Sequence, residues 1–199
     1  MRHAVLIPGT RSWDGTKTDW YSPGSLFVSY LASLDIALLD TDHPFVWSTD
    51  LGGIGFGKND LLVWRAAGVN LYQYLIPPRC SDRRVSPDDT LIITHSHGLQ
   101  VALYAAAYGL KIHTLIDVAG PVRKDMMDTA EHARHNIRHW VHIHAGPKDR
   151  WQWLGELFDG NIGIVRQHPL ANVNLEIKDA NHGDALRNPK FFPLIGDVL

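Results

Sequence analysis

The feature that most constrains this chain is residues 89–109, DTLIITHSHGLQVALYAAAYG, in which a strand pattern changes directly into a helical pattern. Residues 91–93 form a short apolar run rich in β-branched side chains, which is typical of a buried strand. From Leu99 onward, apolar residues recur every three or four positions, as on one face of a helix. Ser96 therefore lies at an abrupt strand-to-helix turn. Such a turn lifts the hydroxyl clear of the backbone and aims the first amides of the helix at what the hydroxyl attacks.

The rest of the chain alternates short apolar runs with helical patterns. This alternation favours an α/β fold with a mainly parallel sheet flanked by helices on both faces, and the chain is expected to form one domain over residues 1–199. In such a sheet the ligand crevice lies at the C-terminal ends of the strands. The predicted strands are residues 4–7, 45–47, 91–93, 111–119, 140–145 and 173–177. The predicted helices are 23–34, 60–74, 99–109, 123–138, 151–158 and a last one from residue 184, broken at Pro189 or Pro193.

Composition and charge exclude several classes of protein. The hydrophobic fraction of 45% and the charged fraction of 20% are typical of a soluble globular domain. A formal net charge of -2 gives no reason to expect nucleic acid or an anionic membrane as a partner. Cys80 is the only cysteine, so the chain has no internal disulfide. The first apolar run, residues 4–7, is too short for a signal-peptide core and no later run approaches a membrane span, which favours a cytoplasmic location.

The turn at residues 94–98, THSHG, resembles the Gly-x-Ser-x-Gly nucleophile elbow of the α/β-hydrolase superfamily. Ser96 matches the serine and Gly98 the second glycine, whereas Thr94 replaces the first glycine. The resemblance extends over nearly the whole chain, from the first strand to His182. It implies a small, lipase-like serine esterase with a catalytic triad, an oxyanion hole and no cofactor. The two leading antiparallel strands and the large lid of the family have no counterpart, so a minimal version of the fold is expected.

A serine hydroxyl is a weak nucleophile and needs a positioned base. Among twelve histidines, His182 is predicted as that base because it follows the last strand, where the family places its catalytic histidine. His95 and His97 flank Ser96, but adjacent residues in a tight turn point away from one another. These two are therefore expected to line the pocket or to be buried and hydrogen-bonded.

The family's chain order is Ser, then Asp or Glu, then His, so the acid that orients the base is sought between Ser96 and His182. Asp149 is favoured, because its context HAGPKD resembles the family's strand-then-acid loop. Asp117 is the alternative, since it also lies near the C-terminal end of a strand.

Two backbone amides are predicted to form the oxyanion hole. One belongs to His97, directly after the nucleophile, and the other to Thr10 in the loop Pro8-Gly9-Thr10. That loop resembles the family's His-Gly-x oxyanion loop with Pro8 in place of the histidine.

Two other patterns bear on phosphate or metal binding. The glycine-rich residues 52–57 lack the Gly-Lys-Ser/Thr ending of a phosphate loop and are interpreted as a flexible loop. His132, His135 and His139 share a face of the predicted helix 123–138 and its end, but the interleaved arginines favour a solvated basic face over a metal site.

The predicted function is hydrolysis of a small-molecule carboxylic ester without a metal. An amidase or thioesterase with the same triad and a non-catalytic binding protein of the same fold remain as alternatives, and the oligomeric state is open.

Overall fold

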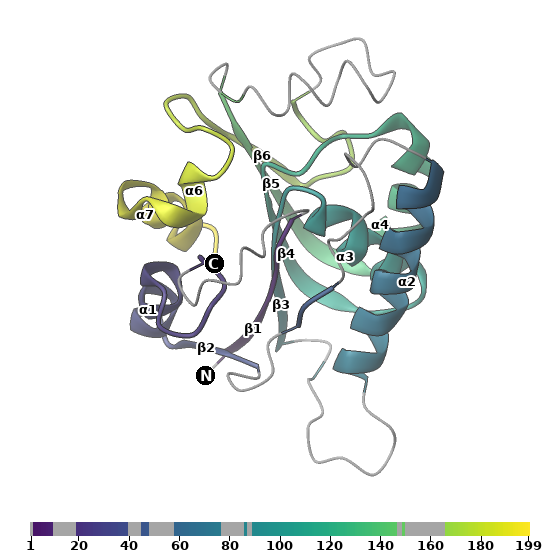
Figure 1. The fold of residues 1–199 in the computed structure, drawn as a ribbon, viewed down its shortest axis with the longest axis horizontal. Helices are drawn as coiled ribbons and strands as arrows, with labels where there is room; N and C mark the ends of the chain where they lie inside the picture. Colours follow the sequence, from purple (N-terminus) through teal and green to yellow (C-terminus); the bar gives the residue numbers. More distant parts are fainter. Residues whose placement is uncertain are drawn as a thin grey trace.

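The computed structural model describes residues 2–9, 19–39, 45–47, 58–76, 86, 89–146, 149 and 166–199, and within them one sheet dominates. Its strand order is β2-β1-β3-β4-β5-β6. Every pairing is parallel, which confirms the predicted parallel α/β architecture (Figure 1). The strands are β1 (Arg2–Ile7), β2 (Ile36–Leu38), β3 (Thr90–His95), β4 (Ile112–Val118), β5 (Ile137–Ala145) and β6 (Val173–Ile177).

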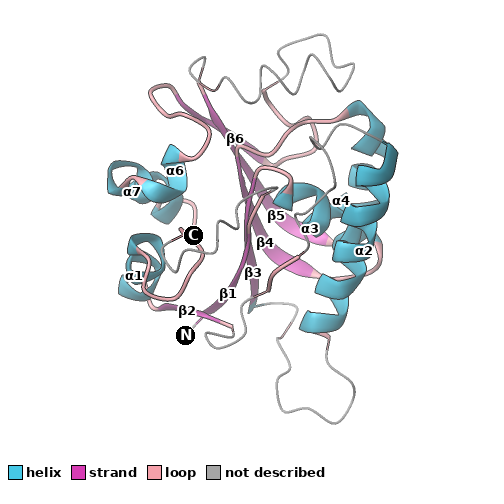
Figure 2. Cartoon of the chain, viewed as in Figure 1, coloured by secondary structure: helices cyan, strands magenta, loops and turns pink. Residues whose placement is uncertain are grey.

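Helices cover both faces of this sheet, as Figure 2 shows. On one face lie α1 (Leu26–Ser33), α6 (Asp184–Arg187) and α7 (Phe192–Gly196); on the other lie α2 (Lys58–Leu75), α3 (Gly98–Ala107) and α4 (Met127–Arg134). Two 3₁₀ turns, η2 (Lys124–Met126) and η3 (Pro189–Phe191), precede α4 and α7. Among the described residues, no helix is both long and apolar enough to span a membrane.

Two apolar cores follow from this arrangement, one on each face of the sheet. Successive side chains of a strand point to opposite faces, so Ile92 of β3 packs toward α2 and α3 while its neighbour Ile93 packs toward α1. All six residues of β3 are buried. A central parallel strand that is covered on both faces has no solvated side. For this reason residues 91–93 are all apolar and show no alternation with polar residues.

The structure corrects the prediction at residues 45–47. Phe45 and Trp47 are buried, but the segment belongs to no strand, and the edge strand β2 lies earlier at Ile36–Leu38. Packing accounts for the apolar pattern, because Phe45 and Trp47 both belong to the core shared with α2 and α3. A three-residue edge strand is too short to produce a recognisable period of its own.

The helix predicted over residues 123–138 is shorter than expected. It is formed by η2 and α4 and ends near Arg134, where Asn136 turns the chain by donating from its backbone amide to Ala133 and from its side chain to Ala106. His132 therefore lies on α4, whereas His139 lies on β5, so the three histidines predicted to share one helix face do not. The last predicted helix is divided into α6, η3 and α7, with Pro189 opening η3 and Pro193 in the first turn of α7. The predicted helix 151–158 and the glycine-rich residues 52–57 lie outside the described residues.

Candidate active site

Ser96 occupies a strained turn between β3 and α3. Its φ angle is +53°, in the left-handed region that residues other than glycine rarely adopt. The Ser96 amide donates to the Val118 carbonyl at 3.0 Å, which ties the turn to the end of β4. A serine held in this conformation between a strand and a helix is the arrangement of a nucleophile elbow, in which the strain exposes the hydroxyl.

Two glycines allow the end of β1 to lie against this elbow. A Cβ atom on Gly98 would come within 2.5 Å of the Ile7 carbonyl oxygen, and a Cβ atom on Gly9 would come within 2.7 Å of the Ser96 Cβ. Real Cβ atoms do not approach other atoms this closely, so both positions require glycine. Thr94, which takes the place of the first elbow glycine, is fully buried, and its hydroxyl has no hydrogen-bond partner among the described residues.

The loop after β1 is anchored by Trp47, which was predicted to lie in a strand. Trp47 donates from its indole Nε1 to the Pro8 carbonyl at 2.8 Å. The Pro8-Gly9 peptide is thereby held beside Ser96, whose Oγ would lie 3.3 Å from a Cβ on Gly9. Thr10, the predicted second oxyanion donor, lies outside the described residues, so its role stays a prediction.

His182 and Asp149 come together from two different strand ends. His182 lies in the turn between β6 and α6, and Asp149 follows β5. The imidazole Nδ1 is 2.9 Å from the Asp149 Oδ2. The Asp149 side chain is fully buried, whereas 18% of the His182 side chain is exposed. The carboxylate therefore orients an imidazole that solvent can still reach.

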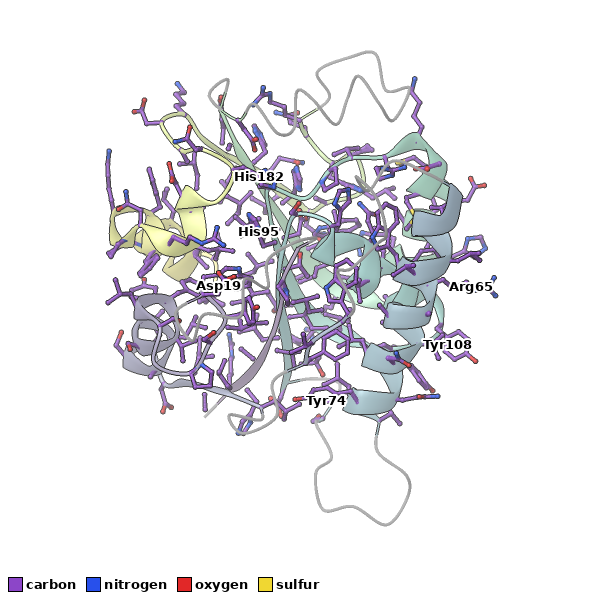
Figure 3. The ribbon with its side chains drawn as sticks, viewed as in Figure 1. Asp19, Arg65, Tyr74, His95, Tyr108 and His182 are labelled. Atoms are coloured by element: carbon purple, nitrogen blue, oxygen red, sulfur yellow. The ribbon has the colours of Figure 1, made fainter. Side chains whose placement is uncertain are left out.

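His95 connects this histidine to the elbow. Its Nε2 lies 2.8 Å from the His182 carbonyl oxygen, and the two ring centroids are 4.8 Å apart. Figure 3 shows His95 and His182 beside one another at the same end of the sheet. Because His95 directly precedes Ser96 in the chain, these contacts place His182 next to the elbow. Burial, together with the nearby His182, lowers the pKa of His95 to about 3, so this ring is neutral near pH 7.

On the other side of the elbow, His97 stacks on Trp64 at a centroid distance of 4.9 Å and an interplanar angle of 17°. The guanidinium carbon of Arg123 lies 4.9 Å from the Trp64 ring centroid, and Arg123 makes two hydrogen bonds to Asp125. Burial and the Arg123 charge lower the pKa of His97 below its ordinary value. The sequence did not reveal this stack, because Trp64 reads simply as an apolar position of a helix.

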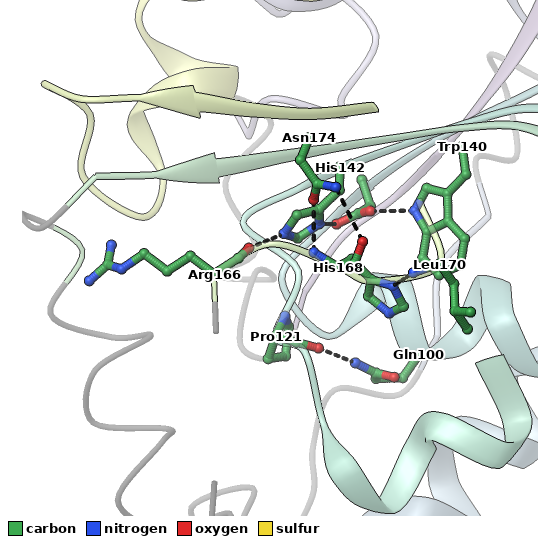
Figure 4. A network of polar contacts seen from close by, with 9 residues as sticks. Gln100, Pro121, Trp140, His142, Arg166, His168, Leu170 and Asn174 are labelled. Atoms are coloured by element: carbon green, nitrogen blue, oxygen red, sulfur yellow. Dashed lines mark hydrogen bonds and ion pairs between the residues drawn. The ribbon is translucent and has the colours of Figure 1, made fainter. Parts of the chain in front are cut away.

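Asp117, the alternative acid, is engaged elsewhere. Its two carboxylate oxygens accept from the Trp140 indole and the His142 Nδ1, each at 2.6 Å (Figure 4). The other ring nitrogen of His142 lies 2.7 Å from the Arg166 carbonyl oxygen. Both nitrogens of His142 thus face acceptors, which favours the doubly protonated ring. Burial alone would lower the pKa of His142, but the Asp117 carboxylate raises it above its ordinary value.

The buried neutral histidines predict a loss of stability in acid. Burial lowers the pKa of His95 to about 3 and that of His168, which is 2% exposed, to about 4. The unfolded chain binds these protons near pH 6.5, so the free energy of unfolding falls as the pH falls below that value. At about pH 5 each histidine should remove about 2 kcal/mol relative to neutral pH, while His142 acts in the opposite sense.

Urea denaturation at neutral pH and at about pH 5 measures this effect. We expect His168→Gln to lose about 2 kcal/mol less than the wild type between the two conditions. The exposed His135→Gln is the matched control and should follow the wild type. An equal fall in the free energy of unfolding in the wild type and in His168→Gln would contradict a lowered pKa of His168 in the folded protein.

No protein-family model matches the sequence, and no curated protein matches it either. Solved structures do resemble the fold. A dienelactone hydrolase-like promiscuous phosphotriesterase from metagenomic libraries superposes with a TM-score of 0.52 at 15% identity, over 92% of this chain and 72% of the other. The esterase domain of a Rhodothermus marinus protein superposes with a TM-score of 0.50 at 15% identity, over 99% of this chain and 84% of the other.

The sheet order, the helical layers and these likenesses define the class: the chain has an α/β-hydrolase-type fold. It is a compact version of that fold. The segment between β4 and β5 carries only η2 and α4, so no large lid is inserted there. Each strand pairing among the described residues is parallel.

Proposed function

We propose that this protein is a serine hydrolase that cleaves a carboxylic ester through an acyl-enzyme, with Ser96 as nucleophile, His182 as base and Asp149 as the orienting acid. The observation that supports the proposal most directly is a series of hydrogen-bonded contacts that connects the turn at Ser96 to Asp149. His95, the neighbour of Ser96, contacts the His182 carbonyl at 2.8 Å, and the His182 ring contacts Asp149 at 2.9 Å. The two solved structures cited above are, by name, a phosphotriesterase and an esterase, which supports hydrolytic chemistry.

The proposed reaction follows from these roles. The Ser96 Oγ attacks the ester carbonyl carbon while His182 Nε2 takes the hydroxyl proton. The resulting oxyanion is stabilised by the backbone amides of His97 and Thr10. The carbon–oxygen bond to the alcohol then breaks, and the alcohol leaves with the proton from His182. A water molecule, deprotonated by His182, attacks the acyl-enzyme and releases the carboxylic acid and free Ser96.

Asp149 has two tasks in this scheme. Its hydrogen bond to Nδ1 keeps the proton of neutral His182 on Nδ1, which leaves Nε2 free to accept the serine proton. Its charge also stabilises the imidazolium that forms after proton transfer. Because the carboxylate is fully buried, water competes little for these interactions.

Covalent labelling of the purified protein with a fluorophosphonate probe tests the proposal. We expect peptide mass spectrometry to find one adduct, on Ser96, because the probe reacts with a serine that a nearby base activates. Turnover of short-chain nitrophenyl esters should accompany the labelling. Ser96→Ala should show neither, whereas Ser33→Ala, at an exposed helical serine, should behave as the wild type. Absence of both labelling and turnover in the wild type would contradict the proposal and favour a non-catalytic binding protein.

A further inference from the structure

The imidazole of His95 lies in an apolar layer, where its presence needs an explanation. The side chain is 5% exposed and faces the core that contains Trp20, with ring centroids 6.2 Å apart. Its Nδ1 is buried and has no hydrogen-bond partner among the described residues. An unpaired buried polar atom costs about 1–3 kcal/mol. An apolar side chain of similar size would avoid this cost, so packing alone does not account for a histidine here.

The other ring nitrogen makes the contact that accounts for it. A carbonyl oxygen only accepts, so the His95 Nε2 must carry the proton and donate to the His182 carbonyl at 2.8 Å. This contact joins residues 87 positions apart in the sequence. It connects the rigid strand β3, which carries the elbow, to the turn that carries His182.

One end of that turn is held by Ala180, which is fully buried in the core on the side of α1, α6 and α7. Asn181 and Asp184 bond to each other across it, through the Asn181 amide to the Asp184 side chain and the Asp184 amide to the Asn181 carbonyl. These bonds shape the turn but do not attach it to the sheet. Asp149 holds the His182 ring from the side of β5, and His95 holds the His182 backbone from the side of β3. These two contacts, one from β3 and one from a residue that follows β5, fix both the distance and the rotation of the imidazole.

We propose that His95 is a positioning residue, which holds the His182 backbone at the distance from Ser96 that proton transfer requires; this inference rests on the proposed function. The ring acts in its neutral form. Asp149, Arg187 and His182 are the charged or titratable groups that act on it, and burial keeps its pKa at about 3. A neutral donor at His95 adds no positive charge beside the His182 imidazolium during the reaction.

The test compares side chains of similar size with and without a donor. In His95→Gln the amide nitrogen reaches the position of Nε2, whereas His95→Met fills the space without a donor. A displacement of about 1 Å at a reacting group can lower the rate about 100-fold. We expect His95→Met to lower kcat for nitrophenyl ester hydrolysis by about 10-fold to 100-fold with little change in KM, and His95→Gln to recover most of the loss. His95→Asn, whose shorter amide does not reach Nε2, replaces Met if that variant does not fold.

A spectroscopic measurement separates this proposal from the proposed function. A histidine Nδ1–H bonded to a carboxylate gives a far-downfield proton resonance, so the His182–Asp149 contact is observable without turnover. Its resonance is the one that disappears in Asp149→Asn, whereas that of the His142–Asp117 pair remains. We expect this resonance to broaden or disappear in His95→Met and to persist in His95→Gln and in the exposed control His135→Gln. If the wild type proves inactive, the proposed function fails while this resonance still decides the positioning role. An unchanged resonance in His95→Met, or a kcat within twofold of an active wild type, would overturn the inference.

Discussion

Asp149→Asn is expected to lower kcat for ester hydrolysis by about 10,000-fold while KM stays within a few-fold of the wild-type value. Asp149 accepts a hydrogen bond from the His182 Nδ1. The amide group of asparagine can donate to Nδ1 instead, which moves the imidazole proton to Nε2. Nε2 is then unable to accept the Ser96 proton, although the side chains keep their places. Steady-state kinetics with nitrophenyl esters measures the effect.

The chain contains its own matched control for this variant. Asp117 is also a buried aspartate that bonds to a histidine Nδ1, but its partner is His142. In Asp117→Asn, the amide can accept from Trp140 and donate to a neutral His142, whose Nε2–H still donates to the Arg166 carbonyl. We therefore expect kcat to remain within about tenfold of the wild type, because every polar atom keeps a partner. If kcat falls strongly in Asp117→Asn but not in Asp149→Asn, Asp117 is the acid that orients His182.

The second large effect concerns stability. His142→Phe is expected to lower the free energy of unfolding at neutral pH by about 3–5 kcal/mol, because it leaves the Asp117 carboxylate buried without its charged partner. Both side chains of this pair are fully buried, so water cannot replace the lost imidazolium. Urea denaturation followed by circular dichroism measures the change.

A double variant distinguishes an unpaired charge from poor packing as the cause. Adding Asp117→Asn to His142→Phe should restore part of the stability, because the buried charge is then absent. A loss below about 1 kcal/mol, or no rescue by Asp117→Asn, would contradict the role of the pair. The folded fraction of His142→Phe should retain ester hydrolysis, since His142 contacts neither His182 nor Asp149 among the described residues.

The two aspartate–histidine pairs thus have similar geometry, but a substitution in one is expected to affect catalysis and a substitution in the other to affect stability. The Asp117–His142 pair is closed to solvent on both sides, and the hydrogen bonds of its histidine go to Asp117 and the Arg166 backbone. The Asp149–His182 pair has one partly exposed member, His182, whose ring can present its Nε2 to a substrate. Solvent access, rather than the presence of a carboxylate–imidazole bond, is what makes the second pair the candidate for catalysis.

Local pattern was sufficient to predict the parallel sheet and the turn at Ser96. Alternating apolar runs and helical periods specify a parallel sheet with two helical layers, because each local pattern admits few packed arrangements. The change of period at residues 94–98 specified the strand-to-helix turn, which the structure shows with Ser96 at φ +53°. The short strand β2, and the end of the helix before β5, were missed or misplaced because their signals are only a few residues long.

The tertiary structure decided which side chains meet. Asp117 and Asp149 both lie near strand ends, and the sequence favoured Asp149 only through the resemblance of its HAGPKD context, but β4 and β5 pair in a register that sets Asp117 opposite His142. Asp149 bonds to the His182 ring, and His95, which lies 87 positions from His182 in the sequence, bonds to the backbone of the same histidine. Strand order and register arise from packing over the whole chain, so no local pattern contains them. The sequence by itself determined the kind of sheet and the turn that holds the serine, and it favoured Asp149 and His182 by resemblance; only the folded chain shows that these two side chains are bonded and that His95 contacts the His182 backbone.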